Sequence, residues 1–414
     1  MPDGRRRRLW CICSNRLWQK GALKRHLPLL RGGVRLAADG FFGVLDAAQA
    51  VHQAVLDTAA PLNPLAPLLD RSTRWVYAGV RGVGRAAALA ADRALALATR
   101  LAGMPLPEFT DAPGQLAWVS ALNGALGDHL ERSANPLALD MRFCLDGQPL
   151  PLHAEALRTA LPPTERLVLF VHGLGMNDRQ WRRPSGADFP VQLRAELGCS
   201  TLALRYNTGR AIACNGAELS WRLQQLFDTH PAPPRDLVLV GHSMGGLVCR
   251  SALAQAQAQG LDWPRRVSAL ICLGSPHGGA PLERYGEALA RRLRRSRYTR
   301  AFARLADARS AGVKDLRHGR YLPDDHPAPA ETGVPCFLIA AALGHAADDA
   351  RTRLLGDGVV PLDSALGRHA DAARSLRVPA ARRRVFFGTG HMDLLSHAGV
   401  YAQVRDWLAT SRTP

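Results

Sequence analysis

The sequence is poor in cysteine and contains no apolar run long enough to cross a membrane. Only 8 of the 414 residues are cysteines, too few for a disulfide scaffold in a chain of this length. Cys249, Cys272 and Cys336 fall within apolar runs, where a thiol packs as a small hydrophobic group. The charge-free stretches 112–127 and 333–347 are shorter than the ~20 apolar residues that a spanning helix requires. We therefore expect reduced thiols and no transmembrane helix.

Several other sequence signals are missing. The run 9–18 is short, is interrupted by Arg16 and lacks a small-residue cleavage site, so we do not expect a signal peptide. Cys11 and Cys13 have no second metal-binding half, which argues against a zinc site. No solenoid repeat and no module that combines aromatic and basic residues for nucleic acid is present. We expect a cytoplasmic protein, free or peripheral on a membrane, with no metal and no nucleic-acid partner.

The positive charge, in contrast, is abundant and concentrated. The formal net charge is +18. Residues 1–35 carry ten basic side chains against one acidic, and residues 284–320 carry twelve against three, which gives +9 for each segment. Such segments are attracted to anionic surfaces such as phospholipid headgroups, but exposed arginine also serves solubility alone. Peripheral contact with an anionic membrane through these two segments and simple solvation both stay open.

The hydrophobic fraction of 47 % can fill a large core, and the texture of the sequence changes near residue 138. We expect a flexible basic segment over 1–35, a helical region over 36–133 and a catalytic domain over 138–410. The helical region should hold one helix over 41–56 and another over 73–102, and the prolines between them, Pro61, Pro64 and Pro67, should separate the two. It could dock on the catalytic domain, rest on a membrane or bind another subunit.

After residue 138, short apolar runs alternate with helix-length segments. Asp146-Gly147 between two such runs predicts a hairpin, because a type I′ turn requires positive φ at both central positions. Continuous apolar strands joined by helices indicate a mostly parallel sheet that is covered on both faces, which is an α/β fold. The further strands are expected over 166–171, 201–206, 236–240, 267–273, 336–342 and 384–387.

The segment Gly241-His-Ser243-Met-Gly245 fits G-x-S-x-G between a strand and a helical run over 247–259. A serine at such a sharp turn has a strained backbone, and the two glycines remove side chains that would clash with neighbouring backbone. Its hydroxyl then points above the sheet at the positive end of a helix. Ser243 is therefore the candidate nucleophile.

The motifs resemble those of the α/β-hydrolase superfamily, and within it the bacterial lipases and esterases that look like the inositol-deacylase (PGAP1-like) hydrolases. The elbow at Ser243, Phe170-Val-His172-Gly-Leu174-Gly175, Gly356-Asp357-Gly-Val-Val-Pro361 and Gly388-Thr-Gly-His391 occur in the expected order between about 138 and 410. The resemblance implies an oxyanion hole formed by the backbone N–H groups of Leu174 and Met244, with His172 structural.

The same resemblance assigns Asp357 as the triad acid and His391 as the base. Asp348, Asp349 and Asp363 lie near enough in sequence to compete with Asp357. His397, six positions after His391, is expected to lie already in a closing helix over 397–409. An unperturbed imidazole titrates near ~6.5, which suits a base that accepts the serine proton and returns it.

Two further expectations concern the segment after the strand 267–273. Ser275 is expected to lie in a loop at the wall of the cleft rather than at an elbow, because Pro276 follows it. The basic helical insertion at about 281–320 stands where these hydrolases place a lid, and it could equally be a solvated helix pair over the sheet.

The function expected from these motifs is hydrolysis of carboxylic esters, of lipid or acyl type, through a Ser-His-Asp acyl-enzyme mechanism that needs no cofactor. A thioesterase or acyltransferase could use the same triad. A catalytically silent, membrane-associated scaffold is the alternative from a different class.

Overall fold

The computed structural model describes residues 27, 29–43, 45–46, 49, 66–101, 113–162, 164–182, 186–280, 310–323 and 333–410. Contacts divide the chain into two compact units, one of residues 1–111 with 130–138 and one of residues 112–129 with 139–414. Within the described ranges, no helix combines the length and the apolar character needed to span a bilayer. Most of the basic segment 1–35, much of the expected helix 41–56 and the part 281–309 of the expected insertion lie outside the described residues.

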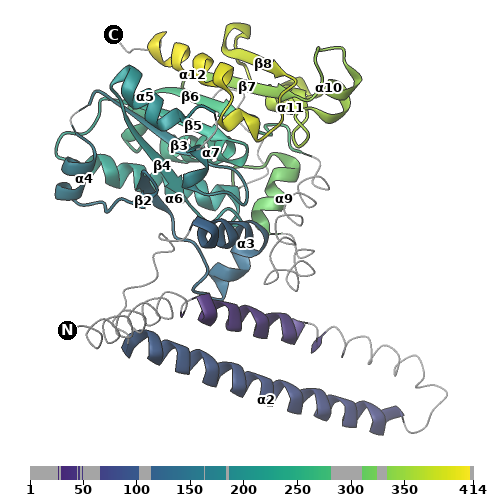
Figure 1. Cartoon of the computed structure of the whole chain (residues 1–414). Helices are drawn as coiled ribbons and strands as arrows, with labels where there is room; N and C mark the ends of the chain where they lie inside the picture. The colour runs from purple at the N-terminus through teal and green to yellow at the C-terminus, as the bar shows by residue number, and fades with distance from the viewer. Residues whose placement is uncertain are drawn as a thin grey trace, which may run out of the picture. The chain divides into compact units, whose positions relative to one another are not determined.

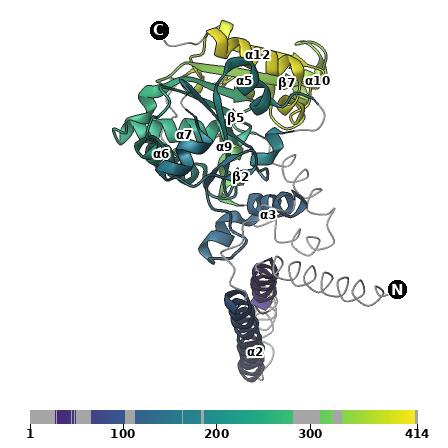
Figure 2. The same cartoon turned by 60° about the vertical axis from the view of Figure 1, so that its left-hand side comes forward.

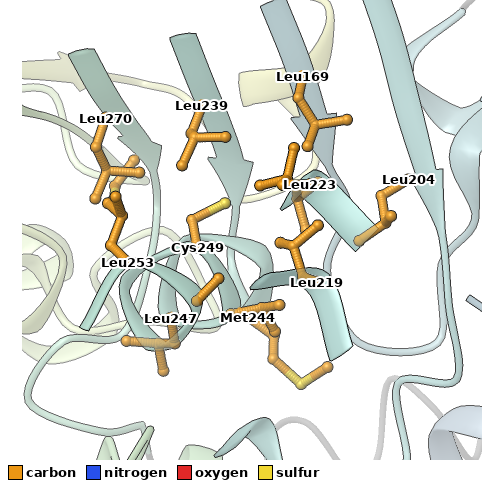
Figure 3. Packing of buried hydrophobic residues seen from close by; sticks show 14 of the residues in the cluster. Leu169, Leu204, Leu219, Leu223, Leu239, Met244, Leu247, Cys249, Leu253 and Leu270 are labelled. Carbon is orange, nitrogen blue, oxygen red and sulfur yellow. The ribbon is translucent and has the colours of Figure 1, made fainter. Parts of the chain in front are cut away.

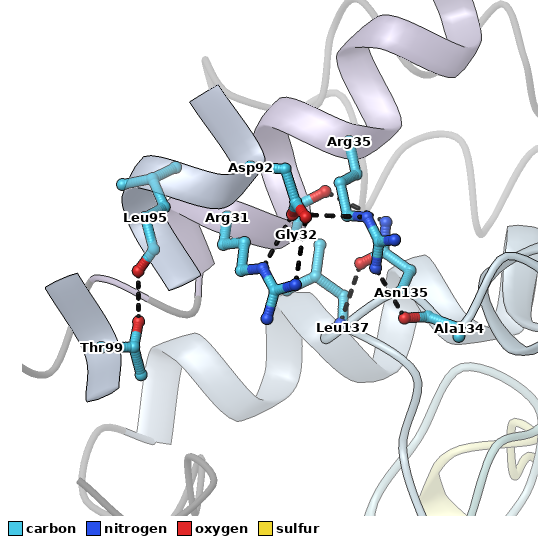
Figure 4. Close-up of polar contacts among 9 residues, drawn as sticks. All are labelled: Arg31, Gly32, Arg35, Asp92, Leu95, Thr99, Ala134, Asn135 and Leu137. Atoms are coloured by element: carbon cyan, nitrogen blue, oxygen red, sulfur yellow. Dashed lines mark hydrogen bonds and ion pairs between the residues drawn. The ribbon is translucent and has the colours of Figure 1, made fainter. Parts of the chain in front are cut away.

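The described residues before residue 102 in the first unit are helical. Residues 29–43 form one helix, and α2 (Ala66–Leu101) is a second, 36 residues long. The guanidinium of Arg31 donates to both carboxylate oxygens of Asp92 at 2.7 and 3.1 Å, and this pair joins the two helices (Figure 4). A Cβ on Gly84 would lie 3.1 Å from the Phe42 ring, so the helices also approach closely further along.

The helix predicted over 73–102 is present but begins earlier, at Ala66. Pro67 therefore lies inside α2, and the prediction that it separates two helices is wrong. Proline is tolerated there because the amides of the first helical turn have no intrahelical acceptor to lose.

The second unit is built on a sheet. Among the described residues, eight strands form the order β2-β1-β4-β3-β5-β6-β7-β8. β1 pairs antiparallel with both β2 and β4, and all other pairings are parallel. The expected mostly parallel α/β architecture is confirmed. The strands are β1 (Arg142–Leu145), β2 (Gln148–Pro149), β3 (Arg166–Val171), β4 (Ser200–Arg205), β5 (Asp236–His242), β6 (Val267–Leu273), β7 (Cys336–Ala342) and β8 (Arg383–Phe387).

Helices cover both faces of this sheet (Figures 1 and 2). The longer ones are α5 (Phe189–Leu197), α6 (Ile212–Thr229), α7 (Met244–Ala258) and α12 (Ala398–Thr410). Shorter ones are α4 (Ala154–Ala160), α9 (Ala311–His318), α10 (Ala350–Leu355) and α11 (Leu362–Ala365), with one-turn 3-10 helices η2 (Asp178–Trp181), η3 (Trp263–Arg266), η5 (Ala372–Arg374), η6 (Ala380–Arg382) and η7 (Asp393–Leu395). The helix α3 (Pro113–Arg132) belongs to this unit up to residue 129.

Two hydrophobic clusters fill the space between sheet and helices. On one face, alternate strand residues such as Leu169 and Leu239 pack with α6 and α7, as Figure 3 shows. On the other face, the intervening residues, such as Phe170 and Val240, pack with α5 and α12. Because successive strand residues point to opposite faces, continuous apolar strands are what a sheet covered on both sides requires.

The predicted hairpin forms between β1 and β2. Asp146 has φ 51° and Gly147 has φ 83°, so both central residues have the positive φ that the turn demands. The strands are shorter than the flanking apolar runs suggested, since β1 begins only at Arg142 and β2 ends at Pro149.

The thiols agree with the sequence-based expectation. Among the described residues, Cys144, Cys199, Cys249, Cys272 and Cys336 are free and buried, whereas Cys214 is free and exposed. Burial raises the pKa of the Cys249 thiol far above its usual range, which makes it an inert packing group.

Candidate active site

Ser243 alone forms the turn between β5 and α7. Its backbone has φ 54° and ψ −124°, and the residue is only 2 % exposed. Such a conformation is strained for a residue with a Cβ, so the surrounding structure must hold it in place. The amide of Ser243 donates to the carbonyl of Leu273 at 2.8 Å, which ties the turn to the end of β6.

The glycines around this serine are sterically required. A Cβ on Gly245 would lie 2.1 Å from the carbonyl oxygen of Val171, and a Cβ on Gly241 would lie 2.4 Å from the amide of Gly246. Both are backbone atoms that cannot move aside, as the sequence predicted. The helix nevertheless starts at Met244 rather than at the predicted residue 247, so Gly245 and Gly246 lie in its first turn.

His391 and Asp357 form a buried hydrogen-bonded pair. Nδ1 of His391 lies 2.6 Å from Oδ2 of Asp357, and the two residues are 6 % and 3 % exposed. The other carboxylate oxygen accepts from the amides of Val359 and Val360 at 2.9 and 2.7 Å. These bonds fix the carboxylate in orientation, and its acceptance at Nδ1 selects the tautomer with the lone pair on Nε2.

The competing aspartates have other roles. Asp349 caps α10 by accepting from the amide of Arg351 at 2.8 Å, and this main-chain hydrogen bond lowers the pKa of Asp349. Asp363 lies in an exposed ion pair with Arg368. Asp348 is exposed. Among the four candidates, only Asp357 is hydrogen-bonded to His391 in the described structure.

Ser243 and His391 lie at the same edge of the sheet and contact the same dipeptide. Ser243 binds the Leu273 carbonyl, and a Cβ on the next residue, Gly274, would lie 3.2 Å from both Nδ1 and Cε1 of His391. The carboxyl ends of the parallel strands meet at this edge. The structure therefore places the turn at Ser243 and the His391–Asp357 pair at the same edge of the sheet.

His242 is a site residue that the sequence reasoning missed. Its Nε2 lies 3.1 Å from the carbonyl oxygen of His391, which accepts, so Nε2 carries the proton. The two rings are 4.7 Å apart. The amide of His391 donates to the carbonyl of Asp357 at 3.0 Å, so both peptide groups that flank the imidazole are held. The sequence did contain a signal for this role: His242 is a polar residue at the end of an apolar strand, directly before Ser243.

The loop after β3 lies directly against the elbow. A Cβ on Gly173 would approach the Cβ of Ser243 to 2.9 Å. The next residue, Leu174, is half-buried. In the described part of the chain, the amides of Leu174 and Met244 donate to no acceptor. Two amides in this state beside a serine turn can bind an oxyanion.

His172 is structural in its contacts. Its Nδ1 lies 3.0 Å from the carbonyl of Gly173 in its own loop, and its ring stacks on Tyr206 at 4.5 Å. The Tyr206 hydroxyl donates to the His172 carbonyl at 2.7 Å. Burial lowers the pKa of His172 to about 4, so the ring is neutral near pH 7.

A buried ion pair anchors the loop that follows β3. Arg205 at the end of β4 donates to both oxygens of Asp178 in η2 at 2.6 and 3.1 Å, and the side chains are 5 % and 0 % exposed. Arg205 also donates to the carbonyl of Gly147 in the hairpin turn at 3.1 Å. This bidentate pair anchors the loop that carries Leu174 to the sheet.

Ser275 lies in a loop after β6, as predicted, and not at an elbow. It is fully buried, and a Cβ on Gly246 would come within 2.1 Å of its hydroxyl oxygen. The described part of the expected insertion is α9, whose Val313 and Leu316 join the main core. No described cluster of His, Cys, Asp and Glu side chains could hold a metal ion.

The described segments on either side of residues 281–309 contact each other. The amide of Ala280 donates to the carbonyl of Leu316 at 3.1 Å. Arg250 of α7 is buried; its guanidinium lies 3.2 Å from Nδ1 of His277 and donates to the hydroxyl of Tyr321 at 2.8 Å. One arginine thus contacts the segments that precede and follow residues 281–309.

Comparisons with known proteins match part of the second unit to one family model. The model of the PGAP1-like alpha/beta domain family matches residues 162–329. A search of curated proteins found no match. Among solved structures, the mature lipase BlEst2 of Bacillus licheniformis is 20 % identical, with 60 % of this chain and 93 % of that chain covered and a TM-score of 0.40.

Two further solved structures are similar at the same level. A putative aryl esterase from Burkholderia cenocepacia is 17 % identical, covering 61 % of this chain and 93 % of that one with a TM-score of 0.36. The RedJ thioesterase of Streptomyces coelicolor is 19 % identical, covering 61 % and 92 % with a TM-score of 0.37. With its mostly parallel sheet and strand–serine–helix turn, the second unit has the α/β-hydrolase fold, and the predicted PGAP1-like resemblance is confirmed over residues 162–329.

Proposed function

We propose that the protein is a serine hydrolase that cleaves carboxylic esters of lipid or acyl type. The observation that carries this proposal is the 2.6 Å hydrogen bond between His391 Nδ1 and Asp357 Oδ2, at the sheet edge where Ser243 occupies a turn with φ 54°. A strained serine beside a histidine that an acid orients is the arrangement for nucleophilic acyl transfer.

The chemistry proceeds in two halves. Ser243 Oγ attacks the ester carbonyl while its proton passes to Nε2 of His391, and Asp357 stabilises the imidazolium that forms. The amides of Leu174 and Met244 hold the oxyanion. The tetrahedral intermediate then collapses, and the alcohol leaves with the proton from His391. Water attacks the acyl-enzyme by the same route in reverse, which releases the acid and restores the serine.

His242 is a positioning residue in this scheme. It acts through the main-chain carbonyl of His391, so it holds the imidazole in place without touching the substrate. We expect His242→Phe, which keeps a flat ring but removes the donor, to lower kcat with little change in KM. His242→Gln, which keeps an N–H donor, should restore part of the rate.

Labelling with a fluorophosphonate probe tests the proposal. We expect the wild-type chain to be labelled and Ser243→Ala to be unlabelled. Ser275→Ala is the matched control, because it removes another buried serine from the neighbouring loop and should leave labelling intact. Labelling that survives Ser243→Ala, or its absence from the wild type, would refute the proposal.

A substrate panel then separates ester from thioester chemistry. p-Nitrophenyl esters of increasing chain length are compared with the matching acyl-thioesters. Higher kcat/KM for long-chain esters supports the proposed class. A preference for thioesters would leave the proposed triad unchanged but would replace esters with thioesters as the proposed substrate class.

A further inference from the structure

The α2 helix exposes an unusual amount of apolar surface. Six of the large hydrophobic side chains that are exposed in the described residues belong to it. Trp75 is 75 % exposed, Val76 64 % and Val83 74 %. The other three are Val80, Leu89 and Leu97.

Most of these side chains share one face of the helix. Exposed apolar residues recur along α2 at alternating steps of four and three, a spacing that places them in one continuous stripe. The stripe consists of Val76, Val80, Val83, Ala87, Ala90, Ala94 and Leu97, all of them exposed. Trp75 lies next to Val76 at the start of this stripe.

A different face of α2 contacts the helix of residues 29–43. Asp92 and Gly84 contact that helix, and Arg81 pairs at 2.6 Å with Asp46, which follows it in the sequence. These positions do not belong to the apolar stripe. The stripe is therefore additional to the surface that joins the two helices.

The charge of α2 is of one sign where it is exposed. Among its described side chains, the exposed charged ones are all arginines: Arg71, Arg74, Arg85, Arg93 and Arg100. The described carboxylate, Asp92, is half-buried and paired with Arg31. The exposed surface of α2 thus combines an apolar stripe, a tryptophan and cations.

We propose that α2 binds the surface of an anionic lipid bilayer, with Trp75, Val76 and Val83 inserted among the acyl chains and the arginines at the phosphate level. A helix with this division of apolar and cationic surface lies in the plane of a membrane interface. Tryptophan is enriched at that depth, where one side of the ring is apolar and the other polar.

A second copy of the chain fits the stripe less well. Helix pairs that associate through such spacing use large side chains at the seam and opposite charges beside it. The middle of this stripe is Ala87, Ala90 and Ala94, and the exposed charged neighbours on α2 are arginines that would face each other. Anionic headgroups neutralise those arginines, so charge complementarity favours lipid.

Co-sedimentation of the full chain with vesicles tests this. We expect binding to vesicles of phosphatidylcholine with phosphatidylglycerol, weaker binding to phosphatidylcholine alone, and loss at high salt. Val83→Asp should reduce binding at least about tenfold, since a valine leaves the bilayer and a negative charge enters. Arg93→Gln should reduce it about fivefold.

Matched variants in the second unit serve as controls. Val191→Asp in α5 and Arg265→Gln in η3 change exposed residues of the same types and should bind as the wild type does. Circular dichroism shows whether α2 variants keep their helix content.

Three results would overturn the proposal. The first is no binding to the anionic vesicles. The second is equal binding by the wild type and Val83→Asp, which would place the attraction in the basic segments 1–35 or 284–320. The third is a dimer in light scattering that Val83→Asp separates, without vesicle binding.

Discussion

The two units differ in where they bury and where they expose apolar residues. In the second unit, strands such as β3 and β5 are apolar at nearly every position, and both of their faces are covered. Its large exposed apolar side chains, which include Trp221 and Leu354, are scattered over separate elements. In the first unit, one helix exposes six. The difference follows from the geometry of the elements. A strand that is covered on both sides can be apolar throughout, whereas a surface helix concentrates its apolar residues in a stripe.

One ion pair from each unit shows a similar contrast. Arg205–Asp178 in the second unit is fully enclosed, at 5 % and 0 % exposure, whereas Arg31–Asp92 in the first unit is 30 % and 15 % exposed. In Figure 4, Asp92 also receives Arg35, whose Nε lies 3.4 Å away. Water therefore reaches the Arg31–Asp92 pair but not the Arg205–Asp178 pair.

The largest effect is expected from the triad acid. Asp357→Asn should lower kcat about 10⁴-fold, because an amide nitrogen or oxygen toward Nδ1 no longer selects the active tautomer. Steady-state kinetics with a short nitrophenyl ester measures this. Asp349→Asn, in the nearby α10 cap, is the control and should change kcat by less than about twofold. Similar losses in both variants would contradict the assignment.

Removal of one partner of the enclosed ion pair should come next. Arg205→Leu strands a buried carboxylate and is expected to lower the free energy of unfolding by about 3–5 kcal/mol. Arg31→Leu in the first unit should cost about 1 kcal/mol or less. Urea unfolding followed by circular dichroism provides the comparison, and equal costs would remove the distinction between the two units.

Truncation of apolar side chains tests burial directly. Leu239→Ala in β5 leaves a cavity in the core and should cost about 3 kcal/mol, whereas Val83→Ala on the exposed stripe should stay within about 0.5 kcal/mol. The readout is again chemical denaturation. A large cost for Val83→Ala would mean that the stripe is packed against protein.

The smallest expected effect is a loss of folding stability at acidic pH, caused by His172. The folded pKa of His172 is about 4, below the ordinary value of 6.5, so the unfolded chain takes up a proton that the folded chain refuses. This contribution to stability is present above the unfolded pKa and is lost progressively as the pH falls toward 4. Between about pH 7.5 and about pH 5 the loss should be about 2 kcal/mol.

His172→Gln should flatten this dependence. Unfolding curves at the two pH values measure it, with the exposed His153→Gln as the matched control. An unchanged slope in His172→Gln would show that other groups cause the acid sensitivity.

Local patterns predicted much of the second unit. The strands β3, β6 and β7 have the predicted bounds, because each is a nearly continuous run of apolar residues. The requirement for glycine at Gly241 and Gly245 followed from the turn that Ser243 must make. These features depend on neighbouring residues in the sequence, which a single sequence displays.

Features that depend on distant residues were not predictable in this way. The Arg205–Asp178 pair and the bond from His242 to the His391 carbonyl join segments that only folding brings together. The expectation that His397 lies within the closing helix is also wrong. Its Nδ1 accepts from the amides of Gly399 and Val400, so it precedes α12 and satisfies amides at the helix start.

The contact of Ala280 with Leu316 has a consequence for engineering and for evolution. A stretch of chain whose two ends already meet can change in length at small entropic cost, since each doubling of a loop costs only about 0.6 kcal/mol. Residues 281–309 could therefore be shortened, lengthened or exchanged for an unrelated sequence while the sheet stays intact. Arg250, which reaches both borders from α7, would be the residue to keep in any such exchange.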